Sequence, residues 1–165
     1  MLNIKFRVWD RTVKVMAKVN QINFHSDYTY PQVFYRYKDP RTGKVTDERA
    51  NFGCDDGCDI VRVMQYTGLK DSNGKEIYEG DILEITITSR SDGSQRKPYN
   101  LVVVYKNGAF VYQYIQGGWK ESNLYSHIDN FAGNVTFEVI GNRYENPELL
   151  KEHEDVKTCR ERRKQ

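Results

Sequence analysis

Two cysteines four residues apart are the first candidates for chemistry in this sequence. Cys54 and Cys58 enclose Asp55-Asp56-Gly57, and two thiols beside such a turn could supply two ligands to a zinc ion. A structural zinc site needs four ligands, and no second pair is spaced to supply the other two. We therefore expect two reduced thiols near a glycine turn, with no metal and no cofactor. The other residues that could bind zinc are scattered: Cys159, His25, His127 and His153.

A pair of acidic residues on either side of Gly80 is the second candidate. Glu79 and Asp81 are two residues apart, so in a strand their carboxylates would point the same way. Such a pair could bind a divalent cation or share a proton, as a hydrolase would require. Acids at turns and strand starts usually accept hydrogen bonds from backbone amides instead. The sequence also has no glycine-rich phosphate loop, nucleophile elbow or HExxH pattern, so we predict no catalytic residues and no enzyme.

Basic residues gather in the polar segment 89–98 and at the end of the chain, where they could hold phosphate groups. Tyr99, Tyr112, Tyr114 and Trp119 could stack on unpaired bases beside them. The formal net charge is only +2, however, and basic residues also suit the end of a helix. Nucleic-acid binding is therefore an alternative function. Its candidate contacts are Arg90, Arg96, Lys97, Arg160, Arg162 and Arg163.

Length and composition favour a globular protein rich in β structure. The chain has 165 residues, enough for one domain with a modest appendage and a real core. Hydrophobic residues make up 38% and charged residues 29%, which is typical of globular rather than disordered chains. The 12 tyrosines and 7 phenylalanines favour strands, where aromatic side chains pack on a pleated surface.

Three features favour a reducing cytoplasm, of a bacterial type or another. The cysteine count is odd, at three, which argues against a disulfide framework. The N-terminus alternates apolar and polar residues and lacks the apolar core of a signal peptide. No apolar run approaches the roughly 20 residues that span a bilayer, so we expect no contact with a membrane.

Alternation of apolar and polar residues predicts that most of the chain is extended. Asn107-Gly108 between two β-rich runs indicates a hairpin, and Asp39-Pro40-Arg41-Thr42-Gly43 indicates another turn. A C-terminal α-helix is expected from Pro147 to about Arg162, because Asn146 is a good N-cap and Pro147 fits the first helical position. The expected strands are 3–9, 12–19, 33–38, 44–49, 81–88, 101–105, 109–115 and 135–140, and 60–66 is a further apolar stretch.

The segment from Met64 to Ile85 is rich in turn chemistry and poor in reactive chemistry. Asp71-Ser72-Asn73-Gly74 is a strong turn, because Asp can accept hydrogen bonds from the backbone ahead of it and Asn-Gly accepts left-handed angles. A second corner follows at Gly80. We infer a scaffold corner that sends the strand 81–88 into the core through two defined bends.

The predicted hairpin 101–115 is apolar on both faces. Val102 and Val104 lie on one side, and Leu101, Val103 and Tyr105 lie on the other. Such a hairpin is expected to be central in a barrel or covered by a second subunit. The candidate subunit contacts are Val102, Val104, Phe110, Tyr112 and Tyr114.

Three blocks of this sequence resemble the YopX family of phage and prophage proteins. They are Ile4 to Asp10 (IKFRVWD), Met64 to Asp81 (MQYTGLKDSNGKEIYEGD) and Phe137 to Leu150 (FEVIGNRYENPELL). The resemblance covers most of the chain up to Leu150, and it implies a β-rich fold with a barrel-like body and self-association. It implies no activity and no catalytic residues. The segment 21–59 and the tail after Leu150 depart from the family's usual form.

Together these observations predict a mainly β protein. We expect a barrel-like or strongly bent antiparallel sheet in a domain covering residues 1–146, with a helix and basic tail over 147–165. The predicted function is that of a non-enzymatic phage or prophage accessory protein that acts through protein contacts. We expect a homo-oligomer, with a phage or host protein as a further partner.

Overall fold

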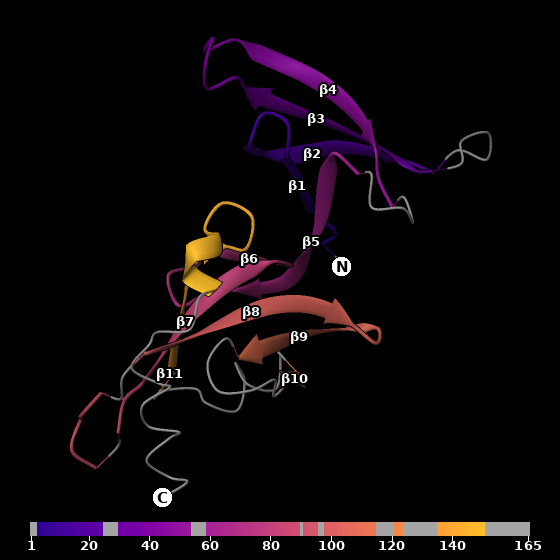
Figure 1. The fold of residues 1–165 in the computed structure, drawn as a ribbon. Helices are drawn as coiled ribbons and strands as arrows, with labels where there is room; N and C mark the ends of the chain where they lie inside the picture. Colours follow the sequence, from indigo (N-terminus) through magenta and orange to yellow (C-terminus); the bar gives the residue numbers. More distant parts are fainter. Residues whose placement is uncertain are drawn as a thin grey trace, which may run out of the picture. The chain divides into compact units, whose positions relative to one another are not determined.

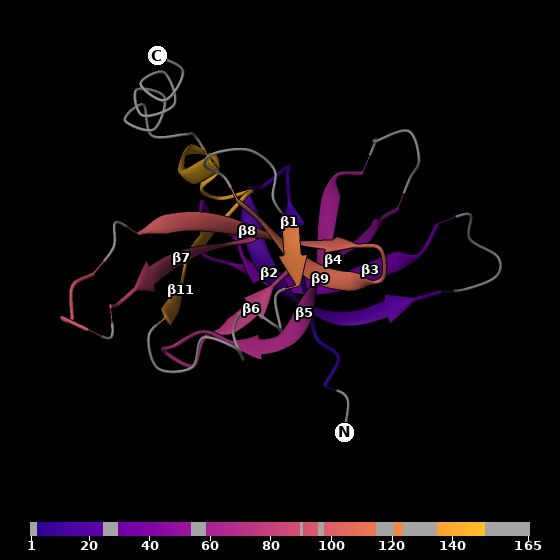
Figure 2. The same ribbon diagram turned by 90° about the horizontal axis from the view of Figure 1, so that it is seen from below.

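The computed structural model describes residues 3–24, 30–53, 59–89, 91–95, 98–114, 121–123 and 135–150. These residues form antiparallel strands and one short 3-10 helix, η1 (Figure 1 and Figure 2). The elements are β1 (Phe6–Asp10), β2 (Val15–Asn23), β3 (Gln32–Lys38), β4 (Val45–Asn51), β5 (Val61–Lys70), β6 (Glu76–Tyr78), β7 (Asp81–Ile87), β8 (Tyr99–Lys106), β9 (Ala109–Tyr114), β10 (Glu121–Asn123), β11 (Val135–Asn142) and η1 (Pro147–Leu150).

The strands belong to two sheets, and the chain divides into two compact units within β5. One sheet has the order β4-β3-β2-β1-β5-β6 and the other the order β10-β9-β8-β7-β11. The N-terminal unit ends at Tyr66 and the C-terminal unit begins at Thr67. Among the described residues, no helix is long and apolar enough to cross a bilayer.

The prediction of a mainly β protein with antiparallel sheets is confirmed, but the expected barrel is wrong. Closure of a sheet into a barrel requires its first and last strands to pair. Among the described residues, the first sheet ends in β4 and β6, and the second ends in β10 and β11. In neither sheet do the two end strands pair with each other. In the second sheet, the outer edge of β11 is instead occupied by the turn 71–75.

The predicted C-terminal α-helix is replaced by a single 3-10 turn in the described residues. The amide of Leu149 donates to the carbonyl of Asn146 at 3.1 Å, which is the i to i+3 bond of a 3-10 turn. The side chain of Asn146 points back along the chain, because its Oδ1 accepts from the amide of Asn142. Residues 151–165 lie outside the described residues, so the domain boundary expected at residue 146 stays a prediction.

In the N-terminal unit, β1 lies between β2 and β5, and β2 and β3 lead outward to β4. The predicted strands 3–9 and 12–19 correspond to β1 and β2, which pair as a hairpin with Val8 opposite Ala17 and Trp9 opposite Met16. Alternate residues of these strands point to one face and exclude water there. This core contains Val8, Ala17, Val33, Tyr35, Tyr37, Ala50 and Val61.

A buried carboxylate joins the first turn to this core. Asp10 is 5% exposed, and its Oδ1 accepts from the amides of Thr12 and Val13. The hydroxyl of Tyr35 donates to the other oxygen at 2.7 Å. Burial, together with this hydrogen bond, raises the pKa of Tyr35 above its ordinary value, so the phenol stays neutral and acts as a donor.

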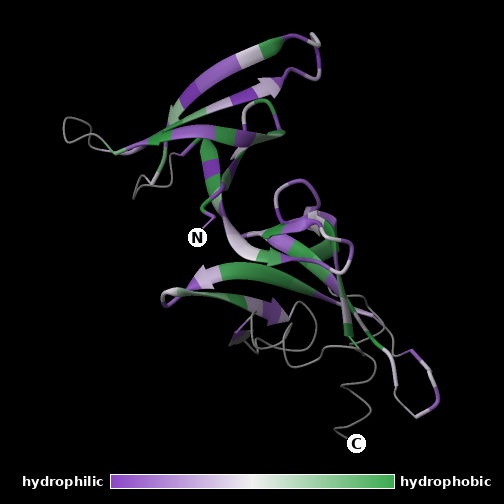
Figure 3. Cartoon of the chain, turned by 180° about the vertical axis from the view of Figure 1, so that it is seen from behind, coloured by the Kyte–Doolittle hydropathy of each residue, from purple (hydrophilic) through white to green (hydrophobic). Residues whose placement is uncertain are grey.

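The C-terminal unit has its own core on one face of the second sheet. Leu101 is opposite Tyr114, Val103 is opposite Tyr112, and Leu83 is opposite Leu101, so these side chains share a face. Figure 3 shows the central strands of this sheet as largely hydrophobic. The buried core residues are Ile77, Leu83, Ile85, Leu101, Val103, Tyr112, Phe137 and Val139.

The turn 71–75 is attached to the outer edge of β11 by side-chain and backbone hydrogen bonds. Asp71 is 7% exposed, and its Oδ1 accepts from the amides of Asn73 and Lys75. Its Oδ2 accepts from the amide of Val139 at 3.0 Å. The neighbouring Ser72 exchanges two hydrogen bonds with Phe137, one through each of its own groups: the Ser72 amide donates to the Phe137 carbonyl, and the Ser72 hydroxyl accepts from the Phe137 amide.

A second junction lies at the corner around Gly80. The amide of Gly80 donates to the carbonyl of Val103, and its carbonyl accepts from the amide of Arg143. Asp81 is 1% exposed, lies opposite Asn142 across the β7–β11 pair, and accepts from the amide of Tyr78 at 2.7 Å. Two of the sequence blocks that resemble the YopX family, 64–81 and 137–150, therefore meet in space.

The Asp71 contacts predict a pH-dependent contribution to stability. Burial by itself raises the pKa of Asp71, but the amides of Val139, Lys75 and Asn73 outweigh burial and hold the pKa below its ordinary value. A carboxyl group with a lowered folded pKa stabilises the fold above its unfolded pKa, and this contribution is lost as the pH falls through the folded pKa. We expect Asp71→Asn to lower the free energy of unfolding by about 2 kcal/mol near neutral pH.

Urea unfolding of both proteins over a series of pH values measures this effect. The difference between wild type and Asp71→Asn should shrink as the pH falls below about 4, the ordinary pKa of an aspartate in the unfolded chain, toward the lower pKa of Asp71 in the folded protein. Asp92→Asn is the control, since among the described residues Asp92 accepts hydrogen bonds from its own exposed turn, and its effect on the free energy of unfolding should be smaller at every pH. A difference that stays constant down to acidic pH would contradict the assignment.

Substitution of Gly141 is a steric test of the corner between β11 and η1. A Cβ atom at this position would lie 2.5 Å from Oδ1 of Asn146 and 3.1 Å from Cδ1 of Leu149. We expect Gly141→Ala to cost about 1–3 kcal/mol through overpacking. The cost should fall in the background of Asn146→Ala, which removes the nearest atoms. Denaturant unfolding of the four proteins of this double-mutant cycle tests the contact, and simple additivity would refute it.

Candidate functional site: a polar hollow beside an edge strand

The described residues of the N-terminal unit contain an open hollow of about 530 Å³. It lies where the start of β3, the end of β4 and the residues before β5 come together. Both polar and apolar groups line it, so it can bind a ligand by hydrogen bonds as well as by contact. The lining residues are Tyr30, Gln32, Arg49, Ala50, Asn51, Asp59 and Ile60.

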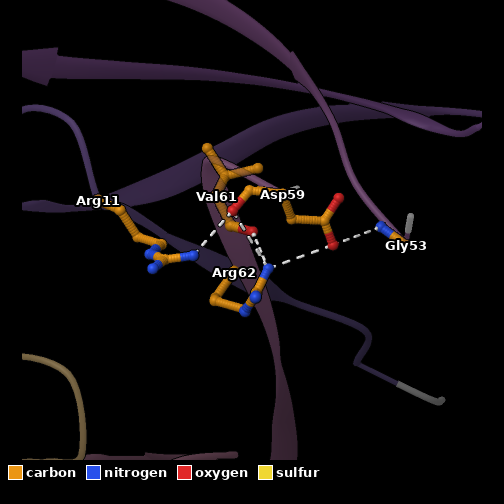
Figure 4. A network of polar contacts seen from close by, with 5 residues as sticks. All are labelled: Arg11, Gly53, Asp59, Val61 and Arg62. Carbon is orange, nitrogen blue, oxygen red and sulfur yellow. Dashed lines mark hydrogen bonds and ion pairs between the residues drawn. The ribbon is translucent and has the colours of Figure 1, made fainter. Parts of the chain in front are cut away.

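Asp59 holds one wall of the hollow in place (Figure 4). Its Oδ2 accepts from the amide of Gly53 at 3.0 Å and lies 3.2 Å from Nη1 of Arg62. The backbone carbonyl of Asp59 accepts from the guanidinium groups of Arg11 and Arg62. The carboxylate is thus engaged by two donors, and its role in this geometry is to position the wall.

The opposite wall is built from the paired ends of β3 and β4. Nε2 of Gln32 donates to Oδ1 of Asn51 at 3.2 Å, and Gln32 is 7% exposed. The amide of Phe52 donates to the carbonyl of Pro31 beyond the ends of the strands. Arg49 adds an exposed guanidinium group to the rim. This set of groups recognises polar partners by hydrogen bonds and charge.

β4, which contributes to the hollow, is also the edge of its sheet (Figure 1). Two hydrogen bonds fix which of its backbone groups point toward β3. The amide of Phe52 donates to the carbonyl of Pro31 at one end of the β3–β4 pair, and the amide of Asp39 donates to the carbonyl of Lys44 at the other end. Between these two ends, every second pair of opposite residues is hydrogen-bonded. Thr46, Glu48 and Ala50 therefore bond to β3. The backbone groups that point outward belong to Val45, Asp47, Arg49 and Asn51.

The side chains along this edge are mostly charged, with one exposed apolar residue. Val45 is 66% exposed, and Figure 3 shows β4 as mainly hydrophilic. Arg36 on β3 forms a two-pronged ion pair with Asp47, with distances of 2.6 and 3.0 Å. The hydrogen bond from Arg36 lowers the pKa of Asp47 and raises the pKa of the guanidinium. Asp47 is therefore ionised at neutral pH, at an edge that solvent reaches.

Most of the residues that the sequence suggests for metal or nucleic-acid binding lie outside the described residues. Cys54, Cys58 and Cys159 lie outside the described residues, as do the six basic residues proposed for nucleic-acid contact: Arg90, Arg96, Lys97, Arg160, Arg162 and Arg163. In the part of the chain that is described, no three His, Cys, Asp or Glu side chains are grouped as metal ligands. Asp81 is buried and accepts from the backbone of its own corner, whereas Glu79 is half-buried.

The residues proposed for subunit contact lie in the middle of the second sheet. Val102 and Tyr112 are buried within one chain, at 8% and 2% exposed. Val104, Phe110 and Tyr114 are half-buried, and Phe110 and Tyr114 make ring contacts inside the unit. The hairpin therefore lies inside an open sheet rather than in a closed barrel. Its contact with a second subunit stays a prediction.

Sequence reasoning found the strand 44–49 but missed the hollow. The alternation of residues and the Asp-Pro…Gly turn before it were sufficient signals for the strand. The hollow is lined by side chains from segments about 30 residues apart, such as Tyr30 and Ile60. No local sequence pattern indicates that such segments come together.

Comparison with known proteins identifies the group to which this fold belongs. A family model described as "YopX protein" matches residues 5–151. The chain belongs to the YopX family. A solved structure with a similar fold is the crystal structure of protein EF1440 from Enterococcus faecalis, at 29% sequence identity and a TM-score of 0.58. The match covers 92% of this chain and all of EF1440. A search of curated proteins gave no match.

The geometry around Asp59 predicts a local change when its side chain is removed from this YopX-family protein. Asp59→Ala leaves the Gly53 amide without its acceptor, so we expect protection of that amide from hydrogen exchange to fall about tenfold. Asp59→Asn keeps an oxygen for Gly53 but loses the ion pair with Arg62, and its effect should be smaller. Residue-resolved exchange measured by NMR checks both variants. Unchanged protection of Gly53 in Asp59→Ala would contradict the proposed wall.

Proposed function

We propose that this YopX-family protein is a non-enzymatic phage or prophage accessory protein that works by binding proteins, including copies of itself. The observation that carries this proposal is the edge strand β4. Its outward backbone donors and acceptors belong to four alternate residues, which is the pattern that an added strand requires.

The contrast between the two sheets supports a binding role for β4. In the second sheet, the outer edge of β11 is covered by the turn 71–75 through Asp71 and Ser72. Natural proteins cover edges in this way to prevent unwanted strand pairing. β4 has charged side chains, which make pairing selective, but its edge has no such cover among the described residues.

The buried acidic residues support a structural rather than a catalytic use of carboxylates. Asp10, Asp71 and Asp81 are each at most 7% exposed, and each accepts at least one hydrogen bond from a backbone amide. A general acid or base must instead reach the proton that it transfers. These three carboxylates hold turns, which suits a scaffold for binding.

The proposed function predicts self-association of the purified chain. Light scattering coupled to size exclusion should give a mass above the 19.4 kDa of one chain at micromolar concentration. A gel-shift assay with single-stranded DNA at two salt concentrations tests the alternative function, nucleic-acid binding, because phosphate contacts weaken as salt rises. A monomer at every concentration would overturn self-association. Salt-sensitive DNA binding by a monomer would favour the nucleic-acid alternative.

A further inference from the structure

We propose that two copies of this chain pair through β4 in antiparallel orientation, about a two-fold axis at Glu48. This inference rests on the self-association proposed above and names the surface and the register. The occupant of the edge is a second copy of the same strand, as the alternation of its backbone hydrogen-bonding groups and its charges indicate.

The alternation of inward and outward backbone groups along β4 restricts where the two-fold axis can lie. An added strand must place outward residues opposite outward residues, and on β4 these are Val45, Asp47, Arg49 and Asn51. In a symmetric antiparallel pair, an axis at Asp47, Glu48 or Arg49 satisfies this condition over most of the strand. An axis nearer to either end leaves much of the strand unpaired.

The charges select one of these three registers. An axis at Asp47 places Asp47 opposite its own copy, and an axis at Arg49 does the same for Arg49. An axis at Glu48 places Asp47 of each copy opposite Arg49 of the other, forming two opposite-charge pairs. Val45 and Asn51 then face each other at the two ends.

The neighbouring strand β3 extends this arrangement. Arg36 lies opposite Asp47 in the β3–β4 pair and already bonds to it through two donors. In the proposed dimer, Asp47 lies between Arg36 of its own chain and Arg49 of the second copy. The ion pair with Arg36 also restricts the Asp47 side chain before binding, which reduces the ordering that binding requires.

The same register has one unfavourable contact, and this contact gives a sharp test. Glu48 lies opposite its own copy at the axis, and like charges directly opposite each other are destabilising. Glu48 is exposed, so water screens the repulsion. We expect Glu48→Gln to strengthen the dimer, whereas an unrelated interface would not respond in this direction.

Complementary charge reversals test the pairing directly. Arg49→Asp places Asp opposite Asp at both pairs, and Asp47→Arg places Arg opposite Arg. Each variant alone should raise the dissociation constant of the full chain about tenfold or more. Mixing the two variants restores both opposite-charge pairs: the native Asp47 of one chain faces the native Arg49 of the other, and the two introduced side chains, one acidic and one basic, face each other. Analytical ultracentrifugation of the separate variants and of their mixture measures this, with circular dichroism as the check of folding.

Arg41→Asp is the matched control. It makes the same charge change in the exposed turn before β4, away from the pairing edge, and it should leave association unchanged. Loss of association in the separate variants and its recovery in the mixture would support the inference. An oligomeric wild type whose mass is unaffected by Arg49→Asp and Asp47→Arg would overturn this inference and leave the proposed function standing. A monomeric wild type would overturn both.

Discussion

The C-terminal unit depends on one buried carboxylate. Asp71 accepts hydrogen bonds from two amides of its own turn and from the amide of Val139, 68 positions away in the sequence. A carboxylate with several amide donors is stabilised in its charged form despite burial, which explains how a charge persists at this position. The same contacts join the segment 64–81 to the segment 137–150, so the parts of the chain most typical of the YopX family form one junction.

This junction covers one sheet edge, that of β11, against pairing with another strand. With the turn 71–75 on β11, the second sheet presents no long open edge on that side. The first sheet ends in β4, whose outward backbone groups alternate with groups bonded to β3. An open edge is an aggregation hazard unless charge restricts its partners. The charged residues of β4 can supply that restriction, because only some registers bring opposite charges together.

The polar hollow at the end of β4 belongs to the same part of the molecule. Arg49 and Asn51 have outward backbone groups and also line the hollow, so a strand added to β4 would lie beside it. Asp59 and Arg62 hold its wall through the backbone and through each other. Binding at the edge of β4 and binding in the hollow would therefore use neighbouring groups of the N-terminal unit.

The sequence by itself determined the mainly β class, the hairpins and the tight corners, because these depend on contacts between residues close in the chain. Asn107-Gly108 and Asp71 to Gly74 specify their turns locally, and the structure places turns at both. Only the tertiary structure decided that the sheets stay open, that the apolar hairpin 101–115 is central, and that the chain beyond Asn146 begins as a 3-10 turn. Those outcomes depend on which distant strand, turn or side chain packs against each edge, and no local pattern contains that information.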